Sequence, residues 1–292
     1  MEFVISTDTA LVFVLYACFI LQFIFFSKQQ RPTIALLITF GLVLLSWALE
    51  LISQTSIPFI SLLYLSAYCA IDRAQIKLIF SRIAFIILAV LSLLFAVHKI
   101  PGFHNELIFS NASFGDSELP FQLYANLDKA LAAIAILIAF NKYINWKVSR
   151  SDLKLISLSI LVFFSFGWLL GAGLDLKFGE LTFVFFFFNL FVTCVAEEAF
   201  FRLLIQDKLA KYLPSMYSAY LAVFFTALIF MLAHFHTGVG AEKRLILIFL
   251  AGLLYGAIYL RSKSLGSAIV MHFAINIIHF SFFTYPATFS EF

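Results

Sequence analysis

Long apolar runs separated by short polar stretches occupy most of this 292-residue chain. Each run is close to the roughly 20 residues that a helix needs to cross the hydrocarbon core of a bilayer. The pattern therefore predicts an all-α, polytopic membrane helical bundle of about ten transmembrane helices, with eight as the lower bound. The candidate spans are residues 9–26, 33–52, 57–71, 78–97, 127–144, 153–174, 181–203, 217–236, 244–261 and 265–284.

The overall composition agrees with this pattern. Hydrophobic residues make up 63% of the chain and charged residues 12%. An ordinary soluble domain is about 45–50% apolar and about 25% charged. A soluble globule is therefore excluded, and we expect an integral membrane protein whose surroundings are the lipid bilayer.

Basic residues gather in alternate loops, around residues 28–31, 73–82, 142–154 and 208–211. Cytoplasmic loops carry an excess of Lys and Arg, so these loops are predicted to face the cytoplasm and both termini the other side. We expect the cell (inner) membrane of a bacterium. The connector 142–154 is too short to read nucleic acid, and its charge suits anionic headgroups instead.

Three parts follow from the distribution of polar residues. Residues 1–97 read as N-terminal scaffold helices without candidate chemistry. Residues 98–126 contain the turn-forming residues Pro101-Gly102, Gly115-Asp116 and Pro120, which predict an extracytoplasmic loop. Residues 127–292 hold the remaining spans, with the active-site core in the last four. The cysteines Cys18, Cys69 and Cys194 lie singly in apolar runs, so no disulfide framework or cysteine-ligated zinc site is expected.

Two adjacent carboxylates, Glu197 and Glu198, and Arg202 interrupt an apolar span. An ionised carboxylate near the bilayer centre costs about 2.5–3.5 kcal/mol, which points to a chemical role. Glu198 and Arg202 are spaced i to i+4 and are predicted to form a supporting ion pair. Glu197 is rotated by about 100° from Glu198 and lacks such a partner, so it is the better candidate for a general base.

Two further polar clusters lie in the last spans, Phe230 with His234 and His272 with Asn276. At 1.5 Å per residue, Glu197 lies about 25 Å before Pro214 and His234 about 30 Å after it, so an antiparallel hairpin places them at similar depth. We therefore predict that Glu197, His234, His272 and Asn276 line one cavity open to the cytoplasm.

Two glycines in the ninth span, Gly252 and Gly256, are four residues apart. Small residues at this spacing let two membrane helices approach each other closely. We interpret both as helix-packing positions.

The ordered motifs Glu197-Glu198-x-x-x-Arg202, Phe230-x-x-x-His234 and His272-x-x-x-Asn276 resemble those of the CPBP family of intramembrane proteases. That family includes type II CAAX prenyl endopeptidases and bacteriocin-immunity (Abi) proteins, and the resemblance covers about residues 180–285. It implies an endopeptidase with a membrane-embedded or membrane-associated peptide or protein substrate. Glu197 with His234 would activate water, and His272 with Asn276 would stabilise the oxyanion.

Alternative functions remain open. In a zinc-dependent protease of this family, Glu197, His234 and His272 would be the metal ligands. The lack of HExxH on one helix, and the poor fit of an Asn carboxamide to zinc, favour a mechanism without metal or cofactor. An ion-coupled transporter also uses intramembrane Glu and His, but its matched halves are missing here. A non-catalytic bacteriocin-immunity protein is disfavoured by the complete motifs.

Overall fold

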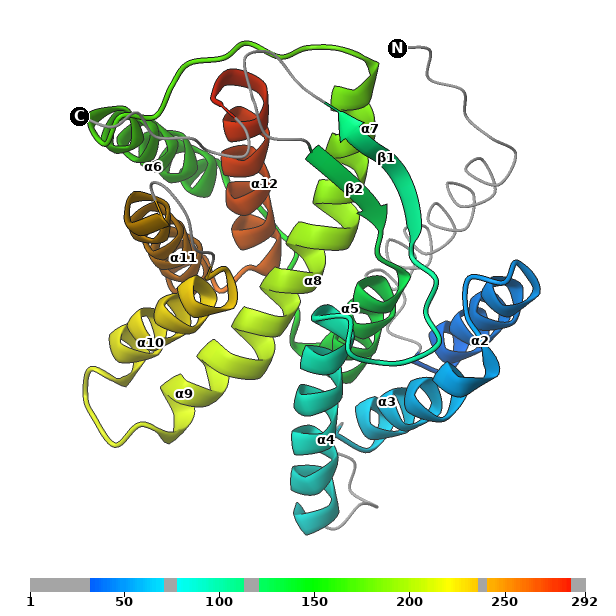
Figure 1. Ribbon diagram of the computed structural model, residues 1–292. Coiled ribbons are helices and arrows are strands. Elements are labelled where there is room, and N and C mark those ends of the chain that lie inside the picture. Colours follow the sequence, from blue (N-terminus) through cyan, green and yellow to red (C-terminus); the bar gives the residue numbers. More distant parts are fainter. Residues whose placement is uncertain (1–31, 71–77, 113–120, 236–240, 285–292) are drawn as a thin grey trace. The chain divides into compact units, whose positions relative to one another are not determined.

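The structure is a computed structural model that describes residues 32–70, 78–112, 121–235 and 241–284 (Figure 1). Helices dominate it, so the predicted all-α membrane class is confirmed. The main helices are α2 Pro32–Ala48, α3 Ile57–Ala70, α4 Leu78–Ala96, α5 Leu127–Phe140, α6 Arg150–Leu169, α7 Glu180–Phe188, α8 Val195–Glu198, α9 Asp207–Tyr212, α10 Ser218–Ala233, α11 Ala241–Ser262 and α12 Leu265–Phe282. Short helical segments are η1 Gln54–Ser56, η2 Asn141–Tyr143, η3 Asn189–Cys194 and η4 Ala199–Gln206.

Five helices in the described residues are long and apolar enough to cross a membrane. They are Ile79–Ala96, Arg150–Leu169, Thr182–Tyr212, Ala241–Ser262 and Leu265–Phe282. Two shorter apolar helices are Ile34–Ala48 and Ser218–Ala233. The chain is therefore an integral membrane protein. The count of ten spans stays a prediction, and the span predicted at 9–26 lies outside the described residues, as do both termini.

The segment predicted as a loop, residues 98–126, contains a small two-stranded sheet. Its strands are β1 Glu106–Ala112 and β2 Phe121–Ala125. The turn-forming residues Gly115, Asp116 and Pro120 fall between the strands in the sequence. The turn signals dominated the sequence pattern because each strand is only five to seven residues long.

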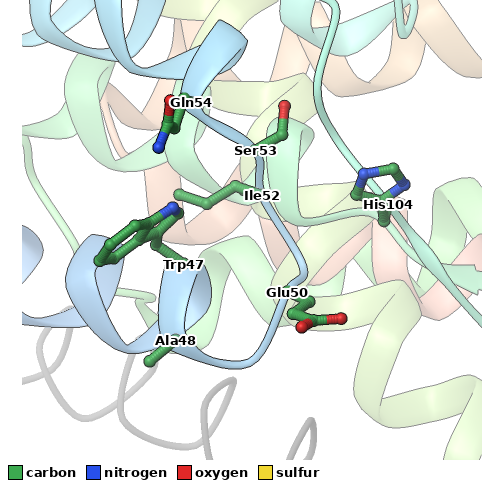
Figure 2. A pocket seen from close by; sticks show the side chains of 7 residues that line it. All are labelled: Trp47, Ala48, Glu50, Ile52, Ser53, Gln54 and His104. Carbon is green, nitrogen blue, oxygen red and sulfur yellow. The ribbon is translucent and has the colours of Figure 1, made fainter.

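The chain divides into two compact units. The N-terminal unit comprises Met1–Ile108, Leu123–Ile144 and Phe191–Ala196, and in it α3, α4 and α5 pack together. The Tyr64 hydroxyl donates to the Leu131 carbonyl at 3.0 Å, and His98 Nδ1 lies 2.7 Å from Asp128 Oδ2. This unit contains a pocket of about 470 Å³. Figure 2 shows its lining side chains, among them Trp47, Glu50 and His104.

The C-terminal unit comprises Phe109–Gln122, Asn145–Leu190 and Glu197–Phe292. In it, α11 packs against α10, α12 and α6 (Figure 1). A Cβ at Gly252 would lie 3.1 Å from Ala227 Cα, so this glycine does allow α11 to approach α10 closely. All the predicted site residues belong to this unit.

The turn between α11 and α12 fixes the start of the helix that carries His272. Lys263 has a φ of 51°, which ends α11, and the Ser264 side chain then caps α12 by accepting from the Ser267 amide at 3.1 Å. Asp152 of α6 accepts from Ser267 Oγ at 3.3 Å and from Arg261 at 2.9 Å. His272 follows about two turns into α12.

The other end of α12 is held by the segment before α7. The amides of Asp175 and Lys177 donate to the carbonyls of Phe282 and Ser281 at 2.9 and 2.8 Å. Lys177 Nζ donates to Asp175 Oδ2 at 2.9 Å and also to the Phe283 carbonyl. The Lys177 ammonium, 2% exposed, therefore lies at the carboxyl end of the helix, where a positive charge is favourable.

Candidate active site

The two glutamates lie in a short α-helical segment with wider helical turns on both sides. The long helix Thr182–Tyr212 contains π-helical turns at Asn189–Cys194 and at Ala199–Gln206, and α8 Val195–Glu198 lies between them. Sequence spacing predicted an uninterrupted α-helix here. A π-helical turn is rare and often occurs at functional sites, so its position beside Glu197 and Glu198 agrees with a chemical role.

Three of the predicted site residues meet in the structure. Glu197 Oε2 lies 3.7 Å from His234 Nε2 and 3.9 Å from His272 Nε2. The side chains are 12%, 34% and 3% exposed, respectively. Residues from three different helical elements, far apart in sequence, thus converge around one carboxylate oxygen.

The His234 ring is oriented by its own helix. Its Nδ1 lies 2.8 Å from the Phe230 carbonyl, which can only accept, so Nδ1 carries the proton. His234 is the C-terminal cap of α10, where helical carbonyls lack their usual partners. The four-residue spacing of Phe230 and His234 therefore has a direct geometric meaning, because it leaves Nε2 facing Glu197.

The His272 ring is oriented by Glu198. Its Nδ1 lies 2.9 Å from Glu198 Oε1, and Tyr255 stacks on the ring at 4.4 Å between centroids. Arg202 Nε donates to Glu198 Oε2 at 2.7 Å, the ion pair that the i to i+4 spacing predicts. Glu198 thus holds His272 as well as Arg202, and the contact with His272 could not be inferred from spacing within one helix.

Asn276 lies one turn beyond His272 on α12. Its Nδ2 donates to Asn189 Oδ1 at 3.3 Å, which uses one of the two amide hydrogens. The ion-pair contacts join Glu197, His234 and His272, so the cavity shared with Asn276 stays a prediction.

Sequence reasoning missed three residues around the cluster: Asn189, Gln206 and Tyr255. Gln206 accepts from Arg202 Nη1 at 2.6 Å and donates to the Gly256 carbonyl at 3.0 Å. Its position four residues after Arg202 was a usable signal, because Arg202 itself follows Glu198 by four. Asn189 and Tyr255 carry no comparable signal, since their partners lie on α12.

A metal centre requires a particular arrangement of ligands around one point. Both histidines direct Nε2 toward Glu197 while Nδ1 faces an acceptor, an orientation that metal-binding histidines share. Among the described residues, however, no group of three or more His, Cys, Asp or Glu side chains is arranged to hold a metal ion. The absence of a metal from the mechanism therefore stays a prediction.

Comparison with known proteins bears on the same region. Residues 179–278 match the family model described as Type II CAAX prenyl endopeptidase Rce1-like. No curated protein and no solved structure matches the chain. The matched segment contains Glu197, Glu198, Arg202 and both histidines of the cluster together with Asn276. Residues 179–278 are therefore similar to this family, which confirms the resemblance to the CAAX protease family that the motifs predicted.

Proposed function

We propose that this protein is an intramembrane endopeptidase that hydrolyses a peptide bond with water activated by Glu197 and His234. The observation that carries the proposal is the convergence of His234 Nε2 and His272 Nε2 on Glu197 Oε2, at 3.7 and 3.9 Å. Both separations exceed a direct hydrogen bond, and they are short enough for one water oxygen beside the groups to contact both of them. Hydrogen bonds of catalytic groups are often long in the absence of substrate.

The reaction uses each group in a defined way. Glu197 accepts a proton from water while the water oxygen attacks the peptide carbonyl carbon, and His234 Nε2 holds that water as a second acceptor. The carbonyl electron pair moves to oxygen. When the C–N bond breaks, the proton held by Glu197 passes to the departing amine. The oxygen of the water thus ends in the new carboxylate, and the proton taken by Glu197 ends on the new amine. Glu197 acts first as general base and then as general acid.

His272 and Asn276 are proposed to stabilise the oxyanion. Glu198 accepts hydrogen bonds from both Arg202 and His272, so the proton on His272 lies at Nδ1. Donation from Nε2 to an oxyanion therefore uses a proton on Nε2 in addition to the one on Nδ1. Asn276 Nδ2 is an amide donor, one turn beyond His272 on α12. Two donors aimed at the developing charge form an oxyanion hole.

We propose a substrate class from the wording of the family match. The name of the family implies a peptide with a prenylated cysteine near its carboxyl terminus, and a site between apolar helices suits a lipid-anchored peptide. The test is a fluorogenic peptide ending in a farnesylated CAAX sequence, given to the protein in lipid nanodiscs. Cleavage of this peptide supports the substrate class. Cleavage of the unprenylated peptide at an equal rate would remove the prenyl group from the proposal.

Zinc analysis separates the metal-free mechanism from its alternative. We expect the purified protein to hold no stoichiometric zinc and to keep its cleavage rate after treatment with chelators. The measurement is elemental analysis beside the peptide assay. About one zinc per chain, lost together with activity in His234→Ala, would instead assign Glu197, His234 and His272 as metal ligands.

We also propose that the site opens to the cytoplasm and that both termini are extracytoplasmic in a bacterial inner membrane. The clustering of Lys and Arg in alternate loops supports this orientation. A C-terminal alkaline phosphatase fusion should be active and a C-terminal green fluorescent protein fusion dark. The opposite pair of signals would reverse the topology.

A further inference from the structure

Gln206 ends a continuous chain of buried hydrogen bonds that begins at His272. His272 Nδ1 donates to Glu198 Oε1 at 2.9 Å, and Arg202 Nε donates to Glu198 Oε2 at 2.7 Å. Arg202 Nη1 donates to Gln206 Oε1 at 2.6 Å, and Gln206 Nε2 donates to the Gly256 carbonyl at 3.0 Å. None of the four side chains is more than 3% exposed. The chain therefore links the backbone of α11 to the ring of His272.

The chemistry at the end of this chain requires an amide. Arg202 can only donate and the Gly256 carbonyl can only accept, so the side chain between them must accept at one end and donate at the other. Gln206 meets both needs, and its oxygen and nitrogen are assigned by these two neighbours. A carboxylate in its place would face the Gly256 carbonyl without a hydrogen to donate, and an aliphatic side chain would serve neither neighbour.

The position of the Arg202 guanidinium depends strongly on its hydrogen bond to Gln206. Its guanidinium is fully buried and is held by Glu198 through Nε and by Gln206 through Nη1. Within the described part of the chain, Nη2 has no hydrogen-bond acceptor. Without Gln206, the buried guanidinium of Arg202 would keep only the Glu198 carboxylate as a side-chain acceptor. We therefore expect the guanidinium to move toward Glu198 and away from its present position.

A second, independent observation marks the same place. A Cβ at Gly256 would lie 2.9 Å from Arg202 Nη1 and 3.0 Å from both Gln206 Oε1 and Val223 Cγ1. From the sequence pattern, we interpreted both Gly252 and Gly256 as helix-packing positions. Gly252 does face the apolar Ala227 and Phe230. Gly256, in contrast, leaves space for the hydrogen-bonded side chains of Arg202 and Gln206.

We propose that Gln206 is a positioning residue for the active site. Anchored to the Gly256 carbonyl, it fixes Arg202, which fixes Glu198, which in turn holds His272 with Nε2 directed toward Glu197. The proposal rests on the proposed function for its effect on cleavage, whereas its effect on the His272 ring is independent of any activity.

The expected effect is on turnover. Gln206 belongs to the buried chain and supports His272 from the side opposite Glu197, so substrate binding should change little. Loss of a residue that orients a functional histidine typically costs about 10- to 100-fold in activity. We expect Gln206→Leu to lower kcat by about that factor, with KM changed less than about threefold.

The experiment combines kinetics with ¹⁵N-histidine NMR on the full chain in nanodiscs. Long-range ¹H–¹⁵N correlations report which ring nitrogen carries the proton, and His272→Asn assigns the signals. The kinetic probe is the fluorogenic farnesylated CAAX peptide. Gln206→Glu serves as a second variant if Gln206→Leu does not fold, since it keeps an acceptor for Arg202. Lys177→Met is the matched control, because it removes another buried polar contact at the far end of α12.

The proposal expects the downfield Nδ1 proton of His272 to shift or vanish in the Gln206 variants and to persist in Lys177→Met, even where both lower Tm. A Gln206 variant with lower Tm but unchanged His272 signals would overturn it and leave Gln206 a merely structural residue. If the wild type cleaves no peptide, the proposed function fails, and the NMR comparison still decides the role of Gln206.

Discussion

Replacing Glu197 by glutamine should reduce the rate of peptide cleavage by about 100- to 10,000-fold, the range usual for the loss of a general base. Glutamine keeps the shape of the side chain but cannot take a proton from water. Glu197 is partly exposed, and its contacts with the two histidines exceed hydrogen-bond length. The variant should therefore insert and fold, with a Tm close to that of the wild type.

The measurement for this variant is kcat on the fluorogenic peptide together with thermal unfolding in detergent. A fall in rate at unchanged Tm supports the assignment of Glu197 as the base. Early unfolding of Glu197→Gln beside a stable but inactive Glu198→Gln would show that the base and the supporting carboxylate have been assigned the wrong way round.

Glu198→Gln and Arg202→Gln should each destabilise the protein, by up to about 3–5 kcal/mol. Both side chains are fully buried, and removing one member of a buried ion pair leaves the other charge without compensation. Glu198→Gln should also lower activity, because His272 loses the carboxylate that accepts from Nδ1. The double variant should be less damaged than the sum of the single effects, since the two residues are in contact.

A double-mutant cycle on Tm and on the free energy of unfolding measures this coupling. Lys177→Met provides a comparison, because it also leaves a buried partner, Asp175, uncompensated but lies at the other end of α12. Purely additive effects of Glu198→Gln and Arg202→Gln would contradict an energetically important pair. Full activity in Glu198→Gln would contradict the role of Glu198 in holding His272.

Much of the fold could be predicted because hydrophobic length alone marks a membrane helix. The spans predicted at 78–97 and 265–284 correspond to Ile79–Ala96 and Leu265–Phe282, for example. The strands Glu106–Ala112 and Phe121–Ala125 were missed, because short strands beside Gly and Pro residues read as a loop. The π-helical turns around Val195–Glu198 were missed as well, since they change backbone hydrogen bonding without a distinct hydrophobic period.

In the site, too, some contacts could be predicted from the sequence and others could not. Contacts within one helix follow from spacing, and the Glu198–Arg202 pair is the example. The approach of Glu197 to His234 agrees with a count of depth from Pro214. Contacts between helices depend on rotation about each axis, which a sequence count does not fix. The bond from His272 to Glu198 and the link from Gln206 to Gly256 therefore emerge only from the structure.

The most direct test of the central claim compares the membrane proteome of host cells carrying the wild-type protein with that of cells carrying Glu197→Gln. Mass spectrometry of protein carboxyl termini detects processing of any membrane protein, whichever one is the substrate. An intramembrane endopeptidase that uses Glu197 predicts at least one membrane-associated protein that is shortened in wild-type cells and full-length in the variant. Identical termini in both membranes, with the two proteins at equal abundance, would contradict it.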